Sequence, residues 1–195
     1  MSRTHTIDRK TTETRINAEL CLDGSGISTI QTGIGFFDHM LTLFCVHGGF
    51  DLKLAADGDL AVDFHHTVED VGLVLGEAVS AALGNRAGIR RYGFAVTPMD
   101  ETLAEVAIDL SNRPYLIWHL PAMTEPADTF HRGLAKEFCR AFSAKGGMNL
   151  HINVRYGENE HHILEAIYKS MGRALAQAIG KDPDRGGVRS SKGVL

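Results

Sequence analysis

Two copies of one short motif constrain this chain more than any other feature of its sequence. Residues 65–69 have the sequence HHTVE and residues 161–165 have HHILE, 96 positions later (161 minus 65). The residues that follow keep the same register, with apolar positions at spacings of four, until each segment reaches a glycine, Gly84 or Gly180. This pattern is typical of amphipathic helices that stop at glycine. The sequence therefore predicts two related halves, each with a helix that begins just after its HHxxE motif.

Each half also shows a shorter helix and several strands before its motif. Residues 36–44 and 134–142 look helical, although the similarity between these two is weaker than that between the motifs. Apolar and polar residues largely alternate, as they do in strands, over residues 12–22, 50–56, 103–110 and 150–156. We therefore predict an α+β fold of two duplicated halves, residues 1–88 and 89–195, with helices covering one face of each sheet. Neither half should be stable alone, since each is short for its core.

The bulk composition excludes several classes of protein. Hydrophobic residues make up 44% of the chain, which is enough for a real core. No apolar run approaches the ~20 residues of a membrane helix, and the polar N-terminus lacks the apolar stretch of a signal peptide, so we expect a cytoplasmic protein without a membrane partner. Three cysteines without close spacing argue against a disulfide framework and a thiolate zinc site. The net charge of -4 gives no reason to expect nucleic acid as a partner.

The motif residues form a candidate metal site. The chain has 10 histidines, four of them in the two adjacent pairs, and residues three or four apart share a helix face, so a histidine and the glutamate of each motif can converge. Adjacent residues diverge by about 100° around a helix, so one pair cannot easily bind a single ion. We expect two ions, each taking one histidine from each half, with His39 of the segment FDHM as an additional ligand. Imidazoles and carboxylates without cysteine suit manganese, iron or zinc, and several carboxylates favour manganese.

Five segments carry a resemblance to a known family. They are FDHM (37–40), HHTVED (65–70), DLSNRPY (109–115), HHILEA (161–166) and SSKGVL (190–195). In order and spacing, along essentially the whole chain, they are similar to the signature blocks of imidazoleglycerol-phosphate dehydratases. The resemblance implies a duplicated α+β fold, of the type named after the second domain of a small-subunit ribosomal protein. It also implies a homo-oligomer in which trimers assemble into a 24-subunit shell, with Mn²⁺ sites at subunit interfaces, two ions per active site.

By motif position, the resemblance also implies the metal ligands. These are His39, His65, His66, Glu69, His161, His162 and Glu165. One further ligand position is often histidine in the family and is Glu137 here, and the weaker repeat also places Glu137 near the equivalent of His39. A glutamate can bind manganese, so Glu137 stays among the predicted ligands. A second departure from the family is Gly35, where proline is common, which affects loop stiffness more than chemistry.

The resemblance assigns a further set of residues to the substrate. Glu13, in the segment TTETRI, matches an acid that lies near the substrate, and the residues that match phosphate-binding positions are Arg91, Arg113, Ser190 and Lys192. Arginine offers a planar fork to phosphate oxygens and lysine adds a compact charge. Residues 182–195 are glycine-rich and basic, which by itself is typical of a flexible tail. The competing prediction is that this tail closes over the phosphate.

The implied reaction removes water from imidazoleglycerol phosphate, giving imidazole-acetol phosphate in histidine biosynthesis. The hydrogen that is lost lies on a carbon that no carbonyl acidifies, so two metal ions on the ring nitrogens would help the ring to expel the hydroxyl group. Glu165 and Glu13 are the candidates for moving protons, and the sequence leaves open which is acid and which is base. The motifs alone leave two alternatives: a binuclear phosphohydrolase, and a non-enzymatic assembly protein whose histidines join subunits through metal.

Overall fold

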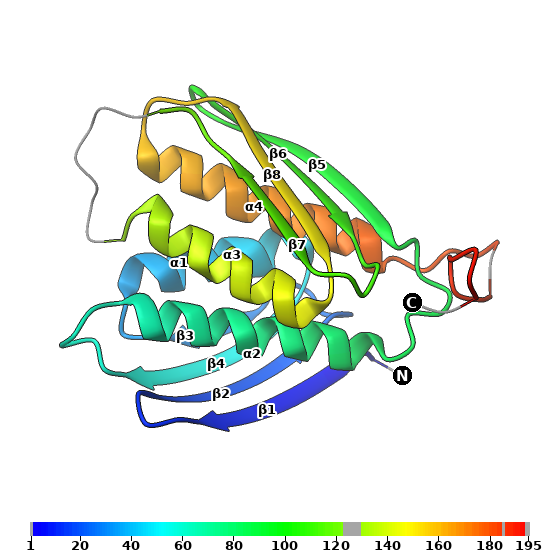
Figure 1. Ribbon diagram of the computed structural model, residues 1–195, viewed down its shortest axis with the longest axis horizontal. Coiled ribbons are helices and arrows are strands. Elements are labelled where there is room, and N and C mark those ends of the chain that lie inside the picture. Colours follow the sequence, from blue (N-terminus) through cyan, green and yellow to red (C-terminus); the bar gives the residue numbers. More distant parts are fainter. Residues whose placement is uncertain (1, 123–129, 185, 194–195) are drawn as a thin grey trace.

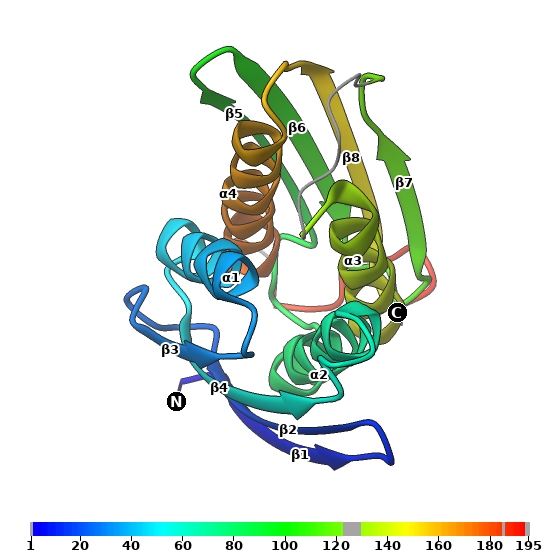
Figure 2. The same ribbon diagram turned by 90° about the vertical axis from the view of Figure 1, so that its left-hand side faces the viewer.

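A layer of four helices lies between two sheets (Figures 1 and 2). The computed structural model describes residues 2–122, 130–184 and 186–193 of the chain. Within these ranges there are eight strands, four in each sheet, and four helices. No helix in the described ranges is long and apolar enough to cross a membrane. The prediction of a duplicated α+β fold with helices on one face of each sheet is confirmed.

The two sheets have the same topology. The first, in the order β1-β2-β4-β3, consists of β1 (Thr4–Lys10), β2 (Thr14–Cys21), β3 (Ser28–Gln31) and β4 (Asp51–Gly58). The second, in the order β5-β6-β8-β7, consists of β5 (Tyr92–Met99), β6 (Thr102–Asp109), β7 (Tyr115–His119) and β8 (Asn149–Tyr156). In both sheets one edge strand is parallel to its neighbour and the other pairs are antiparallel. The repeat in the sequence is therefore a repeat of a whole sheet and its helices.

The helices also repeat, and each motif lies within the first turns of its helix. The four are α1 (Gly35–Gly48), α2 (His65–Leu83), α3 (Arg132–Gly146) and α4 (Glu160–Ile179). The prediction that the long helices begin after the motifs is wrong by about one turn. Polar side chains before each motif satisfy its free N–H groups: Asp63 accepts from the backbone of His65, and Asn159 accepts from the backbone of His162. Both histidine pairs therefore lie at helix N-termini.

Helices pair across the two halves rather than within them. In Figure 2, α1 lies against α4 and α2 lies against α3. Gly76 and Gly172, which are 96 residues apart as the motifs are (172 minus 76), make these approaches possible. A Cβ on Gly172 would collide with the backbone of Phe44 in α1. In the same way, a Cβ on Gly76 would collide with the backbone of Phe142 in α3. The two halves therefore share one interlocked helix layer.

The shared helix layer forms the core. Each of the four helices contributes to its largest fully buried side chains, which include Phe37, Leu75, Phe138 and Tyr168. Each half in isolation would expose the helix faces that contact the other half, which agrees with the expectation that neither is stable alone. The division of the chain at residues 88 and 89 stays a prediction. The arrangement places both motifs at one end of the helix layer and the C-terminal segment at the other (Figure 1).

Candidate metal centre

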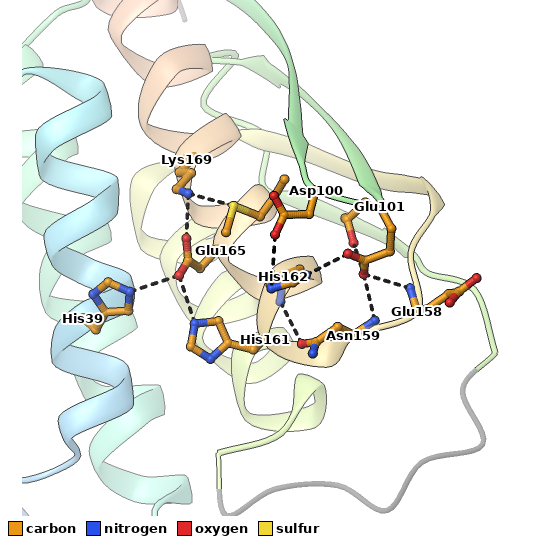
Figure 3. A network of polar contacts seen from close by, with 11 residues as sticks. His39, Asp100, Glu101, Glu158, Asn159, His161, His162, Glu165 and Lys169 are labelled. Carbon is orange, nitrogen blue, oxygen red and sulfur yellow. Dashed lines mark hydrogen bonds and ion pairs between the residues drawn. The ribbon is translucent and has the colours of Figure 1, made fainter.

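Three predicted ligands from both halves converge at the first turns of α1 and α4. Glu165 Oε1 lies 3.2 Å from His39 Nε2 and 2.9 Å from His161 Nε2 (Figure 3). The ligand atoms of these three residues all lie within 4.8 Å of one another. His161 and Glu165 meet because they are four residues apart on α4, whereas His39 reaches them through the α1–α4 pairing. We call His39, His161 and Glu165 the Glu165 cluster.

Glu165 is buried but stays ionised. Its burial alone would raise the pKa of the carboxyl group, but hydrogen bonds with Lys169, His39 and His161 outweigh this and lower the pKa to about 2. Lys169 is the closest of these groups, with Nζ 2.6 Å from Glu165 Oε2, one helical turn further along α4. An ionised carboxylate beside two imidazole nitrogens is a donor set that fits a divalent transition metal such as manganese. The two imidazoles are exposed, so further ligands can approach the cluster.

A second group of predicted ligands lies at the other pair of helices, α2 of the first half and α3 of the second. His65 Nε2 lies 3.6 Å from Glu69 Oε2, again four residues apart on one helix. Arg140 bridges two predicted ligands, with Nη2 2.8 Å from Glu69 Oε1 and Nε 2.7 Å from Glu137 Oε2. His65 and Glu137 also line a cavity of about 530 Å³ between the N-termini of α2 and α3, where His131 is a further lining residue. Glu137 is therefore joined to Glu69 through Arg140 and shares a cavity with His65, but within the described residues only the Glu165 cluster has three ligand atoms within 4.8 Å of one another.

The second histidine of each pair forms a hydrogen bond with an acid outside its motif. The ring centroids within each pair are 6.2 Å apart and the ring planes are nearly perpendicular, which supports the view that one pair does not bind a single ion. His66 Nδ1 lies 2.9 Å from Asp59 Oδ2 and 3.8 Å from Glu13 Oε2, and the hydrogen bond with Asp59 raises the pKa of His66. His162 Nδ1 lies 2.7 Å from Glu101 Oε2, and this hydrogen bond raises the pKa of His162. Glu13 therefore lies near His66, in the motif of the first half of the same chain.

Two of the predicted phosphate-binding residues line one pocket. Arg91 and Ser190 border a cavity of about 640 Å³, together with residues 187–189, Ser191 and Tyr92. Asp109 binds Arg91 through two hydrogen bonds of 2.6 and 3.0 Å, which orients the guanidinium group and leaves part of it free. Lys192 and Arg113 are exposed: Lys192 lies two residues beyond Ser190, and Arg113 lies in the loop before β7.

This phosphate pocket and the Glu165 cluster lie at opposite ends of α4. Arg91 donates its backbone N–H to Ala178 near the C-terminus of α4, whereas His161 is the second residue of the helix. The 17 residues between them (178 minus 161) correspond to about 26 Å at 1.5 Å per residue. Figure 1 shows the same separation, with the C-terminal segment far from the start of α4. No small ligand can contact both sites within one chain.

Several residues of these sites were not predicted from the sequence. Lys169, Arg140, Asp59 and Glu101 each make a contact shorter than 3.0 Å with a predicted ligand. The i,i+4 spacing on α4 would have identified Lys169 as a neighbour of Glu165. The i,i+3 spacing on α3 relates Arg140 to Glu137 in the same way. The contact of Arg140 with Glu69, and those of Asp59 and Glu101, join separate elements and depend on the tertiary fold.

Comparison with known proteins agrees with these features. A sequence model of the family described as imidazoleglycerol-phosphate dehydratase matches residues 32–175. A relative of that name from Desulfosudis oleivorans is 54% identical over 195 residues, covering 100% of both chains. Crystal structures of this dehydratase from Staphylococcus aureus (TM-score 0.82, 37% identity, 92% of this chain and 99% of that one) and Pyrococcus furiosus (TM-score 0.85, 36% identity, 97% and 100%) have the same fold. The chain therefore belongs to the imidazoleglycerol-phosphate dehydratase family, whose members are hydro-lyases of histidine biosynthesis.

Proposed function

We propose that this chain dehydrates imidazoleglycerol phosphate to imidazole-acetol phosphate with two Mn²⁺ ions per active site, and that each active site is shared between copies of the chain. The convergence of His39, His161 and Glu165 is the observation that carries the metal proposal. Three ligands do not fill the expanded coordination sphere of manganese, which leaves positions for a neighbouring copy and for the substrate. The other predicted ligands, which would come from the same and a neighbouring copy, are His65, His66, Glu69, Glu137 and His162.

The distance along α4 supports the sharing of the active site. In imidazoleglycerol phosphate only a three-carbon chain separates the imidazole from the phosphate, so this substrate cannot extend over the about 26 Å of helix between the two sites. A ring bound at the Glu165 cluster of one copy therefore needs a phosphate pocket from another copy. Arg91 and Ser190 line that pocket, and Arg113 and Lys192 add exposed cations for the phosphate.

The chain's own carboxylates supply the groups for proton transfer. The ions, when bound, would act as Lewis acids toward the ring nitrogens of the substrate. Glu165 is ionised at neutral pH, held by Lys169 and the two imidazoles, which suits a metal ligand or a proton acceptor. Glu13 lies in the loop between β1 and β2 with its side chain 51% exposed, free to reach a site on a neighbouring copy. We assign proton transfer to these two residues.

An active site shared between copies also implies that the protein is an oligomer. A site that needs two copies requires an oligomer, and we propose the trimers and 24-subunit shell of the family. Because its ligands come from different copies, metal binding contributes to association. Removal of the metal with a chelator should therefore dissociate the shell toward trimers, as measured by light scattering. A shell that stays intact without metal would contradict ligation between copies.

We also propose that the protein works in the cytoplasm. All three cysteines are free thiols, and Cys45 and Cys139 are buried. Burial raises the pKa of the Cys45 thiol to about 12, so it stays protonated and unreactive. Free thiols are typical of proteins from reducing compartments. Cell fractionation followed by immunoblotting tests the location.

One assay tests the reaction. Purified protein is incubated with Mn²⁺ and imidazoleglycerol phosphate, and both the ketone product and inorganic phosphate are measured. We expect the ketone to accumulate without release of phosphate, and the activity to disappear with a chelator and return with Mn²⁺. Phosphate release would instead identify a phosphohydrolase. An assembled, metal-loaded protein without any turnover would leave only a role in assembly.

A further inference from the structure

The carboxylate of Glu101 holds both the ring of His162 and the beginning of α4. Its Oε2 lies 2.7 Å from His162 Nδ1 (Figure 3). Its Oε1 accepts hydrogen bonds from the backbone N–H groups of Asn159 (2.9 Å) and Glu158 (3.2 Å). Asn159 in turn is the N-cap of α4. One side chain from the β5–β6 turn therefore fixes the position of a predicted ligand relative to its own helix.

The turn that carries Glu101 is strained. Met99 pairs with Thr102, so β5 and β6 are joined by a two-residue turn of Asp100 and Glu101. Asp100 has a φ of 46°, in the left-handed region that few residues other than glycine adopt. Strain of this kind persists where the surrounding structure fixes the conformation, often at functional sites. Here it accompanies a turn that points Glu101 at His162.

Comparison of the two halves indicates what this contact is for. β2 and β6 begin 88 residues apart (102 minus 14), so Glu101 is the counterpart of Glu13 (101 minus 13). In the first half Asp59, directly after β4, is hydrogen-bonded to His66, with its Oδ2 2.9 Å from Nδ1. Glu13 Oε2 lies 3.8 Å from the same nitrogen, beyond hydrogen-bond distance. In the second half the counterpart of Gly58 is Gly157, since these glycines lie against Thr14 and Thr102, the residues that begin β2 and β6. The acid that follows, Glu158, is the counterpart of Asp59, but its side chain makes no hydrogen bond within the described residues.

The crowding at the two glycines is also equivalent: a Cβ at Gly157 would lie 2.6 Å from Thr102 Oγ1 and 2.7 Å from Ile163 Cγ1, and a Cβ at Gly58 would collide with Thr67, 96 residues before Ile163. The two halves therefore hold their second histidine with different acids. The first half uses the acid after the strand and leaves its hairpin acid free for the substrate, whereas the second half uses its hairpin acid.

We propose that Glu101 is a positioning residue that accepts the Nδ1–H of His162 and thereby leaves Nε2 as the nitrogen that binds Mn²⁺. Metal-binding histidines commonly donate their other ring N–H to a carboxylate, which fixes the tautomer and the ring orientation. Asp100 Oδ2 lies 3.7 Å from Nε2, beyond hydrogen-bond distance, so Nε2 remains open. This proposal rests on the manganese site of the proposed function.

The test measures Mn²⁺ binding itself, on the assembled protein. Isothermal titration gives the Kd for Mn²⁺, and pulsed electron paramagnetic resonance detects the imidazole nitrogens bound to the ion. Glu101→Ala should raise the Kd at one class of sites by about 10- to 100-fold and remove one imidazole coupling. The matched control is Glu158→Gln, which removes one negative charge at the same helix end, since the Glu158 side chain has no hydrogen bond or ion pair within the described residues. This control should keep the wild-type Kd within about twofold.

A second variant separates ring positioning from stabilisation of the helix. Asn159→Ala removes the N-cap of α4 and leaves the Glu101–His162 contact in place. We expect it to lower Tm but to change the Mn²⁺ Kd much less than Glu101→Ala. Equal losses of affinity in the two variants would overturn the proposal, and so would an unchanged Kd and imidazole coupling in Glu101→Ala.

The proposal and the proposed function can fail separately. Wild-type protein that binds Mn²⁺ and forms the ketone, with Glu101→Ala unchanged, contradicts only the role of Glu101. Wild-type protein that binds Mn²⁺ without dehydrating the substrate contradicts the function, while the Kd of the variants still decides the role of Glu101. Wild-type protein that binds no Mn²⁺ contradicts both.

Discussion

His39 Nε2 lies 3.2 Å from Glu165 Oε1, although 126 residues separate them in the sequence. This contact exists because α1 of the first half pairs with α4 of the second. The matching pair, α2 and α3, brings Glu137 to the other motif, where Arg140 joins it to Glu69. Glu137 thus occupies the place that His39 has in the Glu165 cluster. The crossed pairing of helices brings together both groups of predicted ligands.

Replacing Glu165 tests the chemistry of the Glu165 cluster. Glu165→Gln removes the negative charge that both imidazoles and Lys169 contact, so turnover should fall by about 10²- to 10⁴-fold. The variant should still assemble, as measured by light scattering, because the amide has the same shape. Glu77→Gln, on the exposed side of α2, is the control and should keep wild-type turnover. Wild-type turnover in Glu165→Gln would contradict a role for this carboxylate.

Removing residues 192–195 tests whether the tail contributes to phosphate binding. The truncation deletes the exposed cation Lys192 next to the pocket of Arg91 and Ser190. Loss of one charge-assisted contact with the phosphate should raise KM by about tenfold or more, with a smaller effect on kcat. Steady-state kinetics at several substrate concentrations separates the two constants. Lys10→Ala removes an exposed cation from β1 and should leave KM unchanged; unchanged kinetics in the truncated protein would refute closure of the tail.

The glycines at the helix crossings should be intolerant of a side chain. Gly172→Ala places a methyl group against the backbone of Phe44, so α1 and α4 must move apart, at a cost of about 1–3 kcal/mol in the free energy of unfolding. Gly35→Ala is the control, because its Cβ would meet nothing within 4 Å and alanine favours helix. Denaturant unfolding at fixed protein and metal concentration measures both. Equal stability of the two variants would mean that the close approach of α1 and α4 does not matter.

The N-terminal strand should be held by a pH-dependent ion pair. Arg3 Nη2 lies 2.6 Å from Asp23 Oδ1, and hydrogen bonds from Arg3 lower the pKa of Asp23 from 3.8 to about 2. A lowered pKa in the folded state means that the contribution is present above pH 4 and is lost as the pH falls toward 2. Because both groups are partly exposed, Asp23→Asn should cost about 1 kcal/mol at pH 7.

The comparison of unfolding curves at pH 7 and pH 3 checks this prediction. The difference between wild type and Asp23→Asn should shrink at pH 3, whereas Asp8→Asn, an exposed change on the outer face of β1, should have no effect at either pH. A difference that grows in acid would have the wrong sign for this ion pair.

Local patterns predicted the parts of the fold that repeat most strongly. Helical periodicity and the terminal glycines identified α2 and α4, and alternation identified β2, β4, β6 and β8, because these elements bury one face. The strands that were not predicted are all edge strands. β1 has only half-buried and exposed residues, β3 has four residues, and β5 contains Gly93 and Pro98.

The sequence predicted ligands within one helix better than contacts between elements. Spacing on a helix is sufficient to place His161 beside Glu165, or His65 beside Glu69. Nothing in the 96-residue repeat indicates that helices pair across the halves. This pairing is what brings His39 of α1 into contact with Glu165 of α4. Glu101 was missed because the hairpins are offset by 88 residues rather than 96, so the motif alignment does not place it opposite Glu13.

Activity of mixed oligomers tests most directly whether the active site is shared. Glu165→Gln removes function from the Glu165 cluster, and a double variant, Arg113→Ala with Lys192→Ala, removes two exposed cations assigned to the phosphate. The variants are unfolded together, refolded in equal amounts and assayed for the ketone. If one copy supplies the cluster and another the phosphate site, random assembly should restore about a quarter of wild-type activity from two inactive parents. Mixed oligomers as inactive as the parents would contradict a site shared between copies.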